Sequence, residues 1–168
     1  MEQEIDRIYA ACGVLQTPIK KQKEKEKNME KLTAETKKLM DERFGHDCII
    51  ALATIDAGLP YVRNVDAYYE DCAFYVVTYA LSNKMNHIAK NPTVAIAGDW
   101  FTAHGTGSNL GFVGKPENKD IMEKLKDAFS AWINEHNNLA DENTCILRIQ
   151  LTDGILFSHG TRFDIDFT

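Results

Sequence analysis

The sequence predicts a mainly β fold with inserted helices, of the α+β class, in which six or seven short antiparallel strands form a closed or partly closed barrel. Three observations support this prediction. The segments rich in β-branched and aromatic residues follow one another as meanders, with turn residues between them. Few of these segments alternate with helices, which argues against a doubly wound parallel sheet. The chain of 168 residues is long enough for one domain with a substantial core.

The N-terminal part, residues 1–44, is expected to be a helical segment that precedes a barrel domain over residues 45–168. Apolar residues recur at helical spacing over residues 1–16. The mixed-charge run at 20–28 is typical of a solvated helix face, on which Lys and Glu side chains stabilise each other. A helical stripe then continues over residues 29–44, and this segment could form an arm that contacts another subunit.

Three strands joined by tight turns are expected next. They comprise residues 48–55, 59–69 and 72–79, and the turns fall at Asp56-Ala57-Gly58 and Glu70-Asp71. Strands that are linked by such short turns pair with each other antiparallel. This region therefore begins the barrel as a meander.

A short helix over residues 83–90 follows the meander, and a strand over residues 92–101 follows the helix. The helix is expected to stop at Asn91-Pro92, because proline disfavours a helical conformation in the residue before it. The glycine-rich stretch 102–116 is either a strand with a bulge or a functional loop.

The last quarter of the chain is expected to be one helix followed by strands. Pro116 suits the first position of a helix, and an apolar stripe indicates that this helix runs to about Leu139. Residues 144–167 read as two or three strands that break at Asp153-Gly154 and at His159-Gly160.

The composition argues against several classes of protein. The net charge of −6 and the isoelectric point of about 5.4 disfavour broad nucleic-acid binding, which requires a basic surface. No apolar stretch reaches the roughly 20 residues that span a bilayer. The N-terminus also lacks the pattern of a secretory signal, so we expect a cytoplasmic protein without membrane contact.

The cysteines and histidines give no metal-binding motif. The four cysteines are widely spaced without a CxxC pair, which indicates reduced and mostly buried thiols; they are Cys12, Cys48, Cys72 and Cys145. The histidines lack HxxxH or HExxH spacing, so no metal is expected. His87 is expected on the outer face of the short helix, and His104 and His159 could serve in a substrate pocket.

The most specific functional signal lies at the start of the short helix. Ser82 is the expected N-cap, and Lys84 falls in the first turn. Arg63 lies on an earlier strand that could pair with the strand before this helix. The helix dipole, the free amides of the first turn and two cations together favour a phosphate. The alternative is that Ser82 only caps the helix and Lys84 faces solvent. Arg63 would then pair with a carboxylate such as Asp66.

The spacing of these residues resembles the phosphate-binding segment of the pyridoxamine 5′-phosphate oxidase-like proteins, a superfamily of flavin-nucleotide-binding split barrels. There, a threonine at a strand end precedes a Ser-x-Lys that opens a helix, and Asn-Pro then leads into a strand towards a tryptophan. An Arg-x-Val lies on an earlier strand. The matching residues here are Arg63, Val65, Thr78, Ser82, Lys84, Asn91-Pro92, Val94 and Trp100.

The resemblance implies a six- or seven-stranded antiparallel split β-barrel that binds FMN at a homodimer interface. Arg63, Ser82 and Lys84 would hold the phosphate. Many members carry an arginine where this chain has Asn83, so part of that contact would fall to the helix terminus. Trp100 would either stack near the flavin or fill the core. Groups that would face the ribityl chain or the ring belong to Asn64, Val65, Val77, Thr78 and Thr106.

The implied activity is that of an FMN-dependent oxidoreductase with a small-molecule substrate, for which NAD(P)H could be the electron donor. No catalytic acid or base is assigned. The arginine-rich C-terminal signature of true pyridoxamine-phosphate oxidases is missing, and Asp164 and Asp166 make the tail acidic. Oxidation of a pyridoxal-type substrate is therefore not expected.

Three alternatives remain open from the sequence. The first is a flavin-binding sensor or carrier without turnover. The second is a haem-binding relative on the same barrel, with His104 or His159 as the axial ligand. The third is an interaction protein with a helical arm and an empty barrel.

Overall fold

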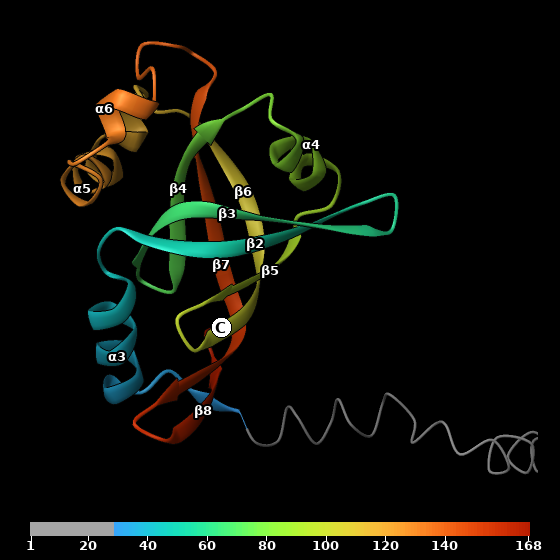
Figure 1. The fold of residues 1–168 in the computed structure, drawn as a ribbon, viewed down its shortest axis with the longest axis vertical. Coiled ribbons are helices and arrows are strands. Elements are labelled where there is room, and N and C mark those ends of the chain that lie inside the picture. Colours follow the sequence, from blue (N-terminus) through green and yellow to red (C-terminus); the bar gives the residue numbers. More distant parts are fainter. Residues whose placement is uncertain (1–28) are drawn as a thin grey trace, which may run out of the picture.

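The computed structural model describes residues 29–168, and the predictions for residues 1–28 lie outside that range. The described chain forms a closed six-stranded antiparallel barrel, with helices on the outside and a two-strand extension at one end (Figure 1). The predicted mainly β fold with inserted helices is therefore confirmed.

The barrel strands come from the middle and the end of the described chain. They are β2 (Cys48–Asp56), β3 (Leu59–Glu70), β4 (Ala73–Tyr79), β5 (Thr93–Gly98), β6 (Phe101–Phe112) and β7 (Thr144–Ser158). Their spatial order is β7-β4-β3-β2-β5-β6, and β6 pairs again with β7 to close the barrel. The predicted meander of β2, β3 and β4 is confirmed.

The barrel separates between β3 and β4. These two strands pair only where residues 68–70 of β3 face residues 73–75 of β4. Further along, residues 59–67 of β3 pair only with β2, and residues 76–79 of β4 pair only with β7. We call this separation the split, because the facing edges of β3 and β4 share no hydrogen-bond ladder there.

A two-strand extension continues the sheet beyond the barrel. β8 (Thr161–Asp166) pairs antiparallel with the second half of β7, and β1 (Glu30–Lys31) pairs parallel with β8. The predicted helical stripe over residues 29–44 is therefore wrong at its beginning, because pairing with β8 holds residues 30 and 31 in an extended conformation.

The first described helix is α3 (Ala34–Phe44), which covers the rest of that predicted stripe. It begins after Thr33, because the side chains of Thr33 and Thr36 form a reciprocal capping box. Met40 and Phe44 are fully buried against the barrel, so α3 shares the hydrophobic core of the strands.

The glycine-rich stretch 102–116 is mostly strand β6, with register shifts after His104 and after Asn109. The expectation of a strand with a bulge is therefore confirmed. A Cβ atom at Gly105 would lie 2.5 Å from the carbonyl oxygen of Gln150, so glycine at this position lets β6 approach β7.

Strand β7 continues without interruption through Asp153-Gly154, where the sequence predicted a break. Gly154 faces β6 on one side and β8 on the other, and a Cβ atom there would lie 2.9 Å from the ring of Phe101. The glycine serves close packing between strands rather than a turn. The predicted turn at His159-Gly160 is confirmed, and both residues have positive φ.

The predicted helix from Pro116 to Leu139 is wrong as a single element. A 3-10 turn η1 (Pro116–Asn118) leads into α5 (Lys119–Ala128), and a separate short helix α6 spans Ile133–His136. The chain turns between the two helices, where the Trp132 indole donates a hydrogen bond of 2.7 Å to the Asp47 carboxylate. The apolar spacing over residues 116–139 gives no indication of this contact with a distant residue.

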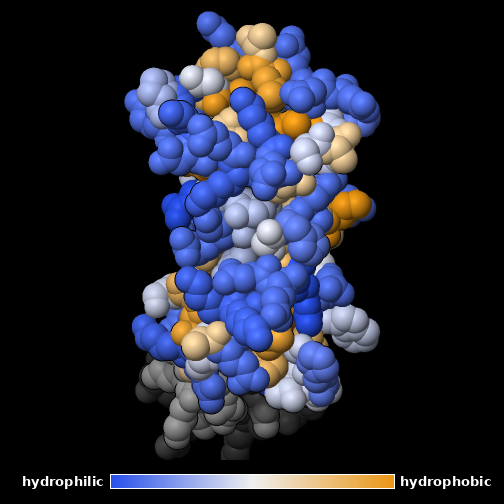
Figure 2. Space-filling view, turned by 90° about the vertical axis from the view of Figure 1, so that its left-hand side faces the viewer, coloured by the Kyte–Doolittle hydropathy of each residue, from blue (hydrophilic) through white to orange (hydrophobic). Residues whose placement is uncertain are grey.

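Two clusters of buried side chains hold the described chain together. The larger fills the barrel and extends beneath α3, and the smaller lies under α5 and α6. The face that carries these three helices is mostly hydrophilic, with hydrophobic side chains gathered at the end where α5 and α6 lie (Figure 2).

Two further expectations can be compared with residues 29–168. No helix in that range is long and apolar enough to cross a membrane. Cys48, Cys72 and Cys145 are free thiols, of which Cys145 is buried and the other two are partly buried. Cys12 lies outside the described residues.

Candidate anion-binding site

Helix α4 (Asn83–Lys90) connects β4 to β5 and carries the predicted phosphate site at its first turn. The buried side chains of Met85 and Ile88 hold the helix on the barrel, where it packs against β2 and β6. On β6, a Cβ atom at Gly107 would lie 3.1 Å from the Ile88 side chain, so the missing side chain allows close contact. The helix ends at Asn91, whose backbone is extended before Pro92, as predicted.

Ser82 precedes α4 with an extended backbone, but its side chain makes no capping hydrogen bond. The Oγ atom is buried, and it has no hydrogen-bond partner among the described residues. A buried polar group without a partner costs about 1–3 kcal/mol. The first-turn amides of α4, from Asn83 to Met85, also have no partner within the helix, because the ladder begins with the bond from Asn86 N to Ser82 O.

Arg63 is half-buried on β3, and its guanidinium reaches across to β2. Its Nη1 atom donates to the Leu52 carbonyl oxygen at 3.2 Å and to the Thr54 Oγ1 atom at 2.7 Å. Burial lowers the pKa of the Arg63 guanidinium from its usual range. The side chain is therefore oriented by neutral acceptors and not by a carboxylate.

Lys84 is half-buried on the first turn of α4, and two causes lower the pKa of its ammonium group. Burial is the larger cause, and the positive charge of Arg63 is the second. The buried thiol of Cys145 acts weakly in the opposite sense. Cys145 pairs with Thr78 across β7 and β4, the strand that leads into α4.

Neither Arg63 nor Lys84 forms an ion pair with a carboxylate in the part of the chain that the structure describes. The structure differs from the alternative in that Ser82 makes no capping hydrogen bond, Lys84 is half-buried, and Arg63 does not bind Asp66. We call Arg63, Ser82 and Lys84 the α4 site. Two neighbouring cations and a buried hydroxyl without partners are what an anion would complete.

Two residues next to the α4 site, Thr54 and His87, were not predicted from the sequence to lie there. Thr54 is fully buried, and its Oγ1 lies 3.0 Å from the Nδ1 atom of His87. The prediction that His87 lies on the outer face of its helix is wrong, because only 7% of its surface is exposed and its ring packs 4.7 Å from that of Tyr61. Helical spacing gave a usable signal, since His87 follows Lys84 by three positions.

The other residues predicted to face a ribityl chain or ring lie on strands next to the split. Asn64 and Val65 belong to β3 where it pairs only with β2, and Val77 and Thr78 belong to β4 where it pairs only with β7. Val65, Val77 and Thr78 are buried, and Asn64 is exposed.

Asn83 and Thr106 are both exposed. Asn83 is the first residue of α4, adjacent to Ser82. Thr106 pairs with Thr93 at the start of β5, so it lies on the sheet near the end of α4.

Trp100 lies away from the α4 site, in the turn that joins β5 to β6. Its side chain is 76% exposed, so the expectation that it could fill the core is wrong. Its backbone has positive φ, and its carbonyl oxygen accepts a hydrogen bond from Phe157 N, which holds the indole at the surface. Within one chain, the structure does not bring Trp100 to Lys84, because all of β5 separates them.

The two histidines considered for a pocket lie on other elements. His104 is exposed on β6, where its Nδ1 atom lies 2.9 Å from the carboxylate of Asp153. His159 occupies the turn between β7 and β8, next to the Ser158 hydroxyl. Among residues 29–168, no group of three or more potential ligands could hold a metal ion.

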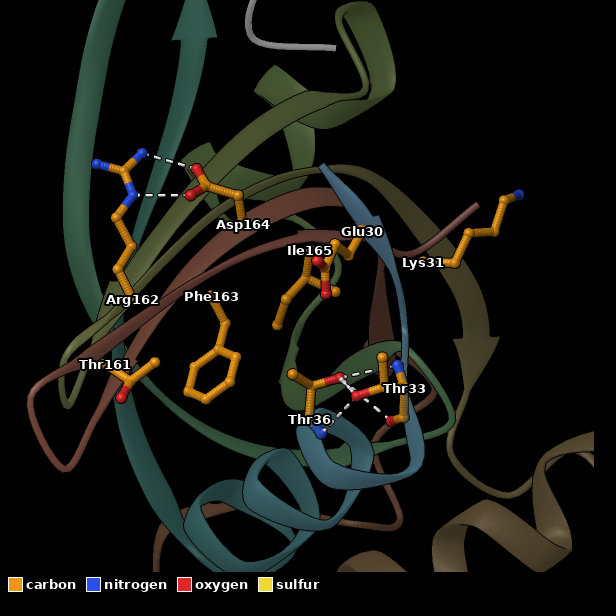
Figure 3. Close-up of a pocket in the computed structure, with 9 residues that line it drawn as sticks. All are labelled: Glu30, Lys31, Thr33, Thr36, Thr161, Arg162, Phe163, Asp164 and Ile165. Carbon is orange, nitrogen blue, oxygen red and sulfur yellow. Dashed lines mark hydrogen bonds and ion pairs between the residues drawn. The ribbon is translucent and has the colours of Figure 1, made fainter. Parts of the chain in front are cut away.

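A cavity at the β8 end offers an instructive contrast (Figure 3). It has a volume of about 280 Å³ between β1, the start of α3 and β8. Its polar groups already bind one another: Thr36 with Thr33, and Arg162 with both oxygens of Asp164. The α4 site differs because Arg63 and Lys84 have no carboxylate partner among the described residues and the Ser82 Oγ atom has no hydrogen-bond partner there.

The architecture identifies the class of protein, and a comparison with known families then identifies the family. A closed six-stranded antiparallel barrel that separates between β3 and β4 is a split β-barrel. The chain belongs to the pyridoxamine 5′-phosphate oxidase family, which it matches over residues 36–156. The resemblance seen in the sequence is thus confirmed. No curated protein matches the chain significantly.

Several solved structures share the fold at low sequence identity. A NimC/NimA family protein from Clostridium acetobutylicum is 18% identical, with a TM-score of 0.57 over 76% of this chain and 91% of its own. A FAD-binding protein from Mesorhizobium loti is 18% identical, with a TM-score of 0.56 over 73% and 92%. A haem-binding protein from Mycobacterium smegmatis is 13% identical, with a TM-score of 0.57 over 73% and 54%.

Proposed function

We propose that the chain binds FMN and acts as an FMN-dependent oxidoreductase on a small molecule. One observation carries the proposal: Arg63 and Lys84 are neighbouring cations without carboxylate partners, beside the unpartnered Ser82 hydroxyl. A phosphate monoester carries nearly two negative charges at neutral pH and several acceptor oxygens. It would neutralise both cations and accept hydrogen bonds from Ser82 and from the first turn of α4.

The split gives a path for the rest of the ligand. FMN, when bound, would supply the electron and hydride transfer, while the chain binds and orients it. The edges of β3 and β4 that share no ladder offer main-chain groups at Asn64 and Val77, because the main-chain groups of Val65 and Thr78 point towards β2 and β7. Buried Val65 and Val77 would exclude water from the ligand. A flavin is further supported by the FAD-binding protein among the structures that share the fold.

We also propose a homodimer with the cofactor at its interface. Large hydrophobic side chains are exposed on both flanks of the α4 site: Tyr61 and Val62 on β3, and Tyr79 and Leu81 just before Ser82. Exposed hydrophobic patches of this kind are typical of interaction surfaces. A second copy of the chain that covers them would also enclose the ligand.

The test compares two ligands that differ only in the phosphate. The double variant Arg63→Ala/Lys84→Ala should bind FMN about 1,000-fold more weakly, because it loses charged hydrogen bonds of about 1.5–3 kcal/mol each. Riboflavin binding should weaken less than about threefold, since riboflavin has no phosphate to lose. Dissociation constants would come from quenching of flavin fluorescence at fixed ionic strength.

Lys90→Ala is the matched control on the same helix, because Lys90 pairs with Asp56 at the far end of α4. It should leave both affinities unchanged. Equal losses of FMN and riboflavin in the double variant would contradict the proposed phosphate site.

Turnover is tested separately on the purified flavin complex. Steady-state oxidation of NAD(P)H with added acceptors would support the oxidoreductase. A yellow protein that is inactive with every donor would instead be a flavin carrier or sensor. A Soret band with no flavin absorption would mean that haem is the ligand, as in the Mycobacterium smegmatis protein that shares the fold.

A further inference from the structure

Thr54 and His87 form a hydrogen-bonded relay behind Arg63 that the proposed phosphate contact does not itself require. The relay begins at the guanidinium, which has five N–H donors. Both hydrogens of Nη1 are used, one on the Leu52 carbonyl oxygen and one on Thr54 Oγ1. The Nε and Nη2 donors remain, and together they form the fork that binds two oxygens of a phosphate.

The direction of the first hydrogen bond in the relay follows from chemistry, and the direction of the second depends on the tautomer of His87. Arginine is only a donor, so Thr54 Oγ1 must accept the bond of 2.7 Å from Arg63. The single hydroxyl hydrogen of Thr54 is then available for His87 Nδ1, which lies 3.0 Å away. In this arrangement Nδ1 is the acceptor and the neutral imidazole carries its proton on Nε2.

The imidazole is held from several sides. His87 is 7% exposed, packs on the ring of Tyr61, and directs Nε2 towards Asp56, whose carboxylate lies 3.9 Å away. Asp56 itself pairs with Lys90 at 3.0 Å, and this pair lowers the pKa of the Asp56 carboxyl. The charged groups around the relay are therefore Asp56 and Lys90 at one end, and Arg63 and Lys84 at the other.

We infer that Thr54 and His87 are positioning residues, which fix the Arg63 guanidinium so that its free fork faces the phosphate held by α4. The relay joins β3, which carries Arg63, to the same helix that carries Ser82 and Lys84. It therefore sets the distance and angle between the two halves of the α4 site. This inference rests on the proposed function, because it assigns a role in the binding of the same phosphate.

The experiment removes one hydroxyl without changing the shape of the side chain. Thr54→Val should weaken FMN binding about tenfold, the loss of one charged hydrogen bond. Riboflavin binding should change less than about twofold, and Thr54→Ser should restore FMN affinity to within about threefold of the wild type. A merely structural role of Thr54 would weaken both ligands alike, so the ratio of the two affinities is the readout.

A double-mutant cycle tests the route through Arg63. In an Arg63→Ala background, Thr54→Val should have no further effect on FMN, because the guanidinium that Thr54 holds is absent. His87→Leu removes the other end of the relay, and its FMN and riboflavin affinities are compared in the same way. This variant replaces Thr54→Val if that protein does not fold. Thr102→Val, on an exposed position of β6, is the matched control and should change neither affinity.

The outcomes separate this inference from the proposed function. If the wild-type protein binds FMN and riboflavin equally, the phosphate site and the relay both fail. If the wild type prefers FMN but Thr54→Val and His87→Leu keep the full preference, the α4 site stands and the positioning role is overturned. An undiminished effect of Thr54→Val in the Arg63→Ala background would also overturn it.

Discussion

Arg43 and Arg63 are two half-buried arginines that both donate to main-chain carbonyls of the barrel, yet they differ in how their charge is balanced. Arg43, on α3, donates to the carbonyl oxygens of Asp99 at 3.0 Å and Phe157 at 2.9 Å, and its Nε lies 3.6 Å from the Asp99 carboxylate. Arg63 binds a carbonyl and a hydroxyl, and the nearest charge that affects its site is the positive charge of Lys84.

The comparison separates an arginine whose charge is balanced within the chain from one that we propose binds a ligand. Arg43 joins α3 to the β5–β6 turn and to the end of β7, and the Asp99 carboxylate balances its charge within the chain. Arg63 is held as firmly, but its charge is balanced by nothing in residues 29–168. An unbalanced, partly buried cation is unfavourable for folding, so its presence indicates a function that requires it.

The largest expected effect is that alanine variants of these two arginines change different properties, FMN binding for Arg63 and stability for Arg43. Arg63→Ala should weaken FMN binding about 100-fold through the loss of a forked contact, while Arg43→Ala should leave it within about threefold. Conversely, Arg43→Ala should lower the free energy of unfolding by about 2–3 kcal/mol, and Arg63→Ala by less than about 1 kcal/mol. Fluorescence titration measures the first quantity, and urea denaturation measures the second.

Lys84→Gln, which keeps a side chain of similar length, controls for the packing of the stem in these titrations. The comparison breaks if both arginine variants lose stability equally while FMN binding is unaffected. The comparison is sharpened if Arg63→Ala changes only the affinity for FMN and Arg43→Ala changes only the free energy of unfolding.

A smaller effect is expected from pH. Because the pKa of Lys84 is lowered, its ammonium group loses its proton at a lower pH than an ordinary lysine does. The preference for FMN over riboflavin should therefore decline as pH rises through the alkaline range, by up to about tenfold for one lost charged contact. Arg63 stays charged, so part of the preference should remain.

The ratio of the two dissociation constants, measured between neutral pH and about pH 10, removes changes that both flavins share. Lys84→Arg should flatten this profile, because a guanidinium stays charged throughout. A wild-type ratio that stays constant over the whole range would show that the charge of Lys84 does not contribute to phosphate binding.

The smallest effect concerns the stability of the ligand-free protein. Lys84→Met removes a half-buried cation beside Arg63 and keeps the apolar stem, so it should raise the free energy of unfolding by roughly 0.5–1 kcal/mol. Lys90→Met, on the same helix, removes an exposed lysine that pairs with Asp56 and should instead destabilise slightly. A loss of stability in Lys84→Met, measured by urea denaturation, would mean that the Lys84 charge is balanced in the folded chain.

The strands and the start of α4, which carries Ser82 and Lys84, were predictable because their signals are local. The turn at Asp56-Ala57-Gly58 and the spacing of Ser82, Lys84 and Asn91-Pro92 each fall within a short stretch of sequence. Arg63 required one further step, the pairing of its strand with the strand before α4, and the structure forms that pairing only at residues 68–70, since Arg63 itself pairs with β2. These features depend on short-range geometry, which residue type and spacing determine directly.

The features that were missed depend on contacts between distant segments. The break between α5 and α6 accompanies the bond from Trp132 to Asp47, which lie 85 positions apart. His87 is bonded to Thr54, which lies 33 positions earlier. Gly154 resembles a turn residue in the sequence because the strands that pack on both sides of it, β6 and β8, are separate segments of the chain. Composition and period carry no signal for the contacts of Trp132 and Gly154, and for His87 only its helical spacing from Lys84 gave one.

Gly107 is a residue outside the α4 site on which the position of helix α4 depends. It lies on β6, touches none of the residues of the α4 site, and presents only a hydrogen atom to Ile88 on the inner side of α4. The Cβ atom of an alanine at this position would lie 3.1 Å from the Ile88 side chain, so Ile88 would have to shift by a few tenths of an ångström. The proposed anion site at the start of α4 is thus carried by a helix whose seat on the barrel requires a glycine beneath Ile88.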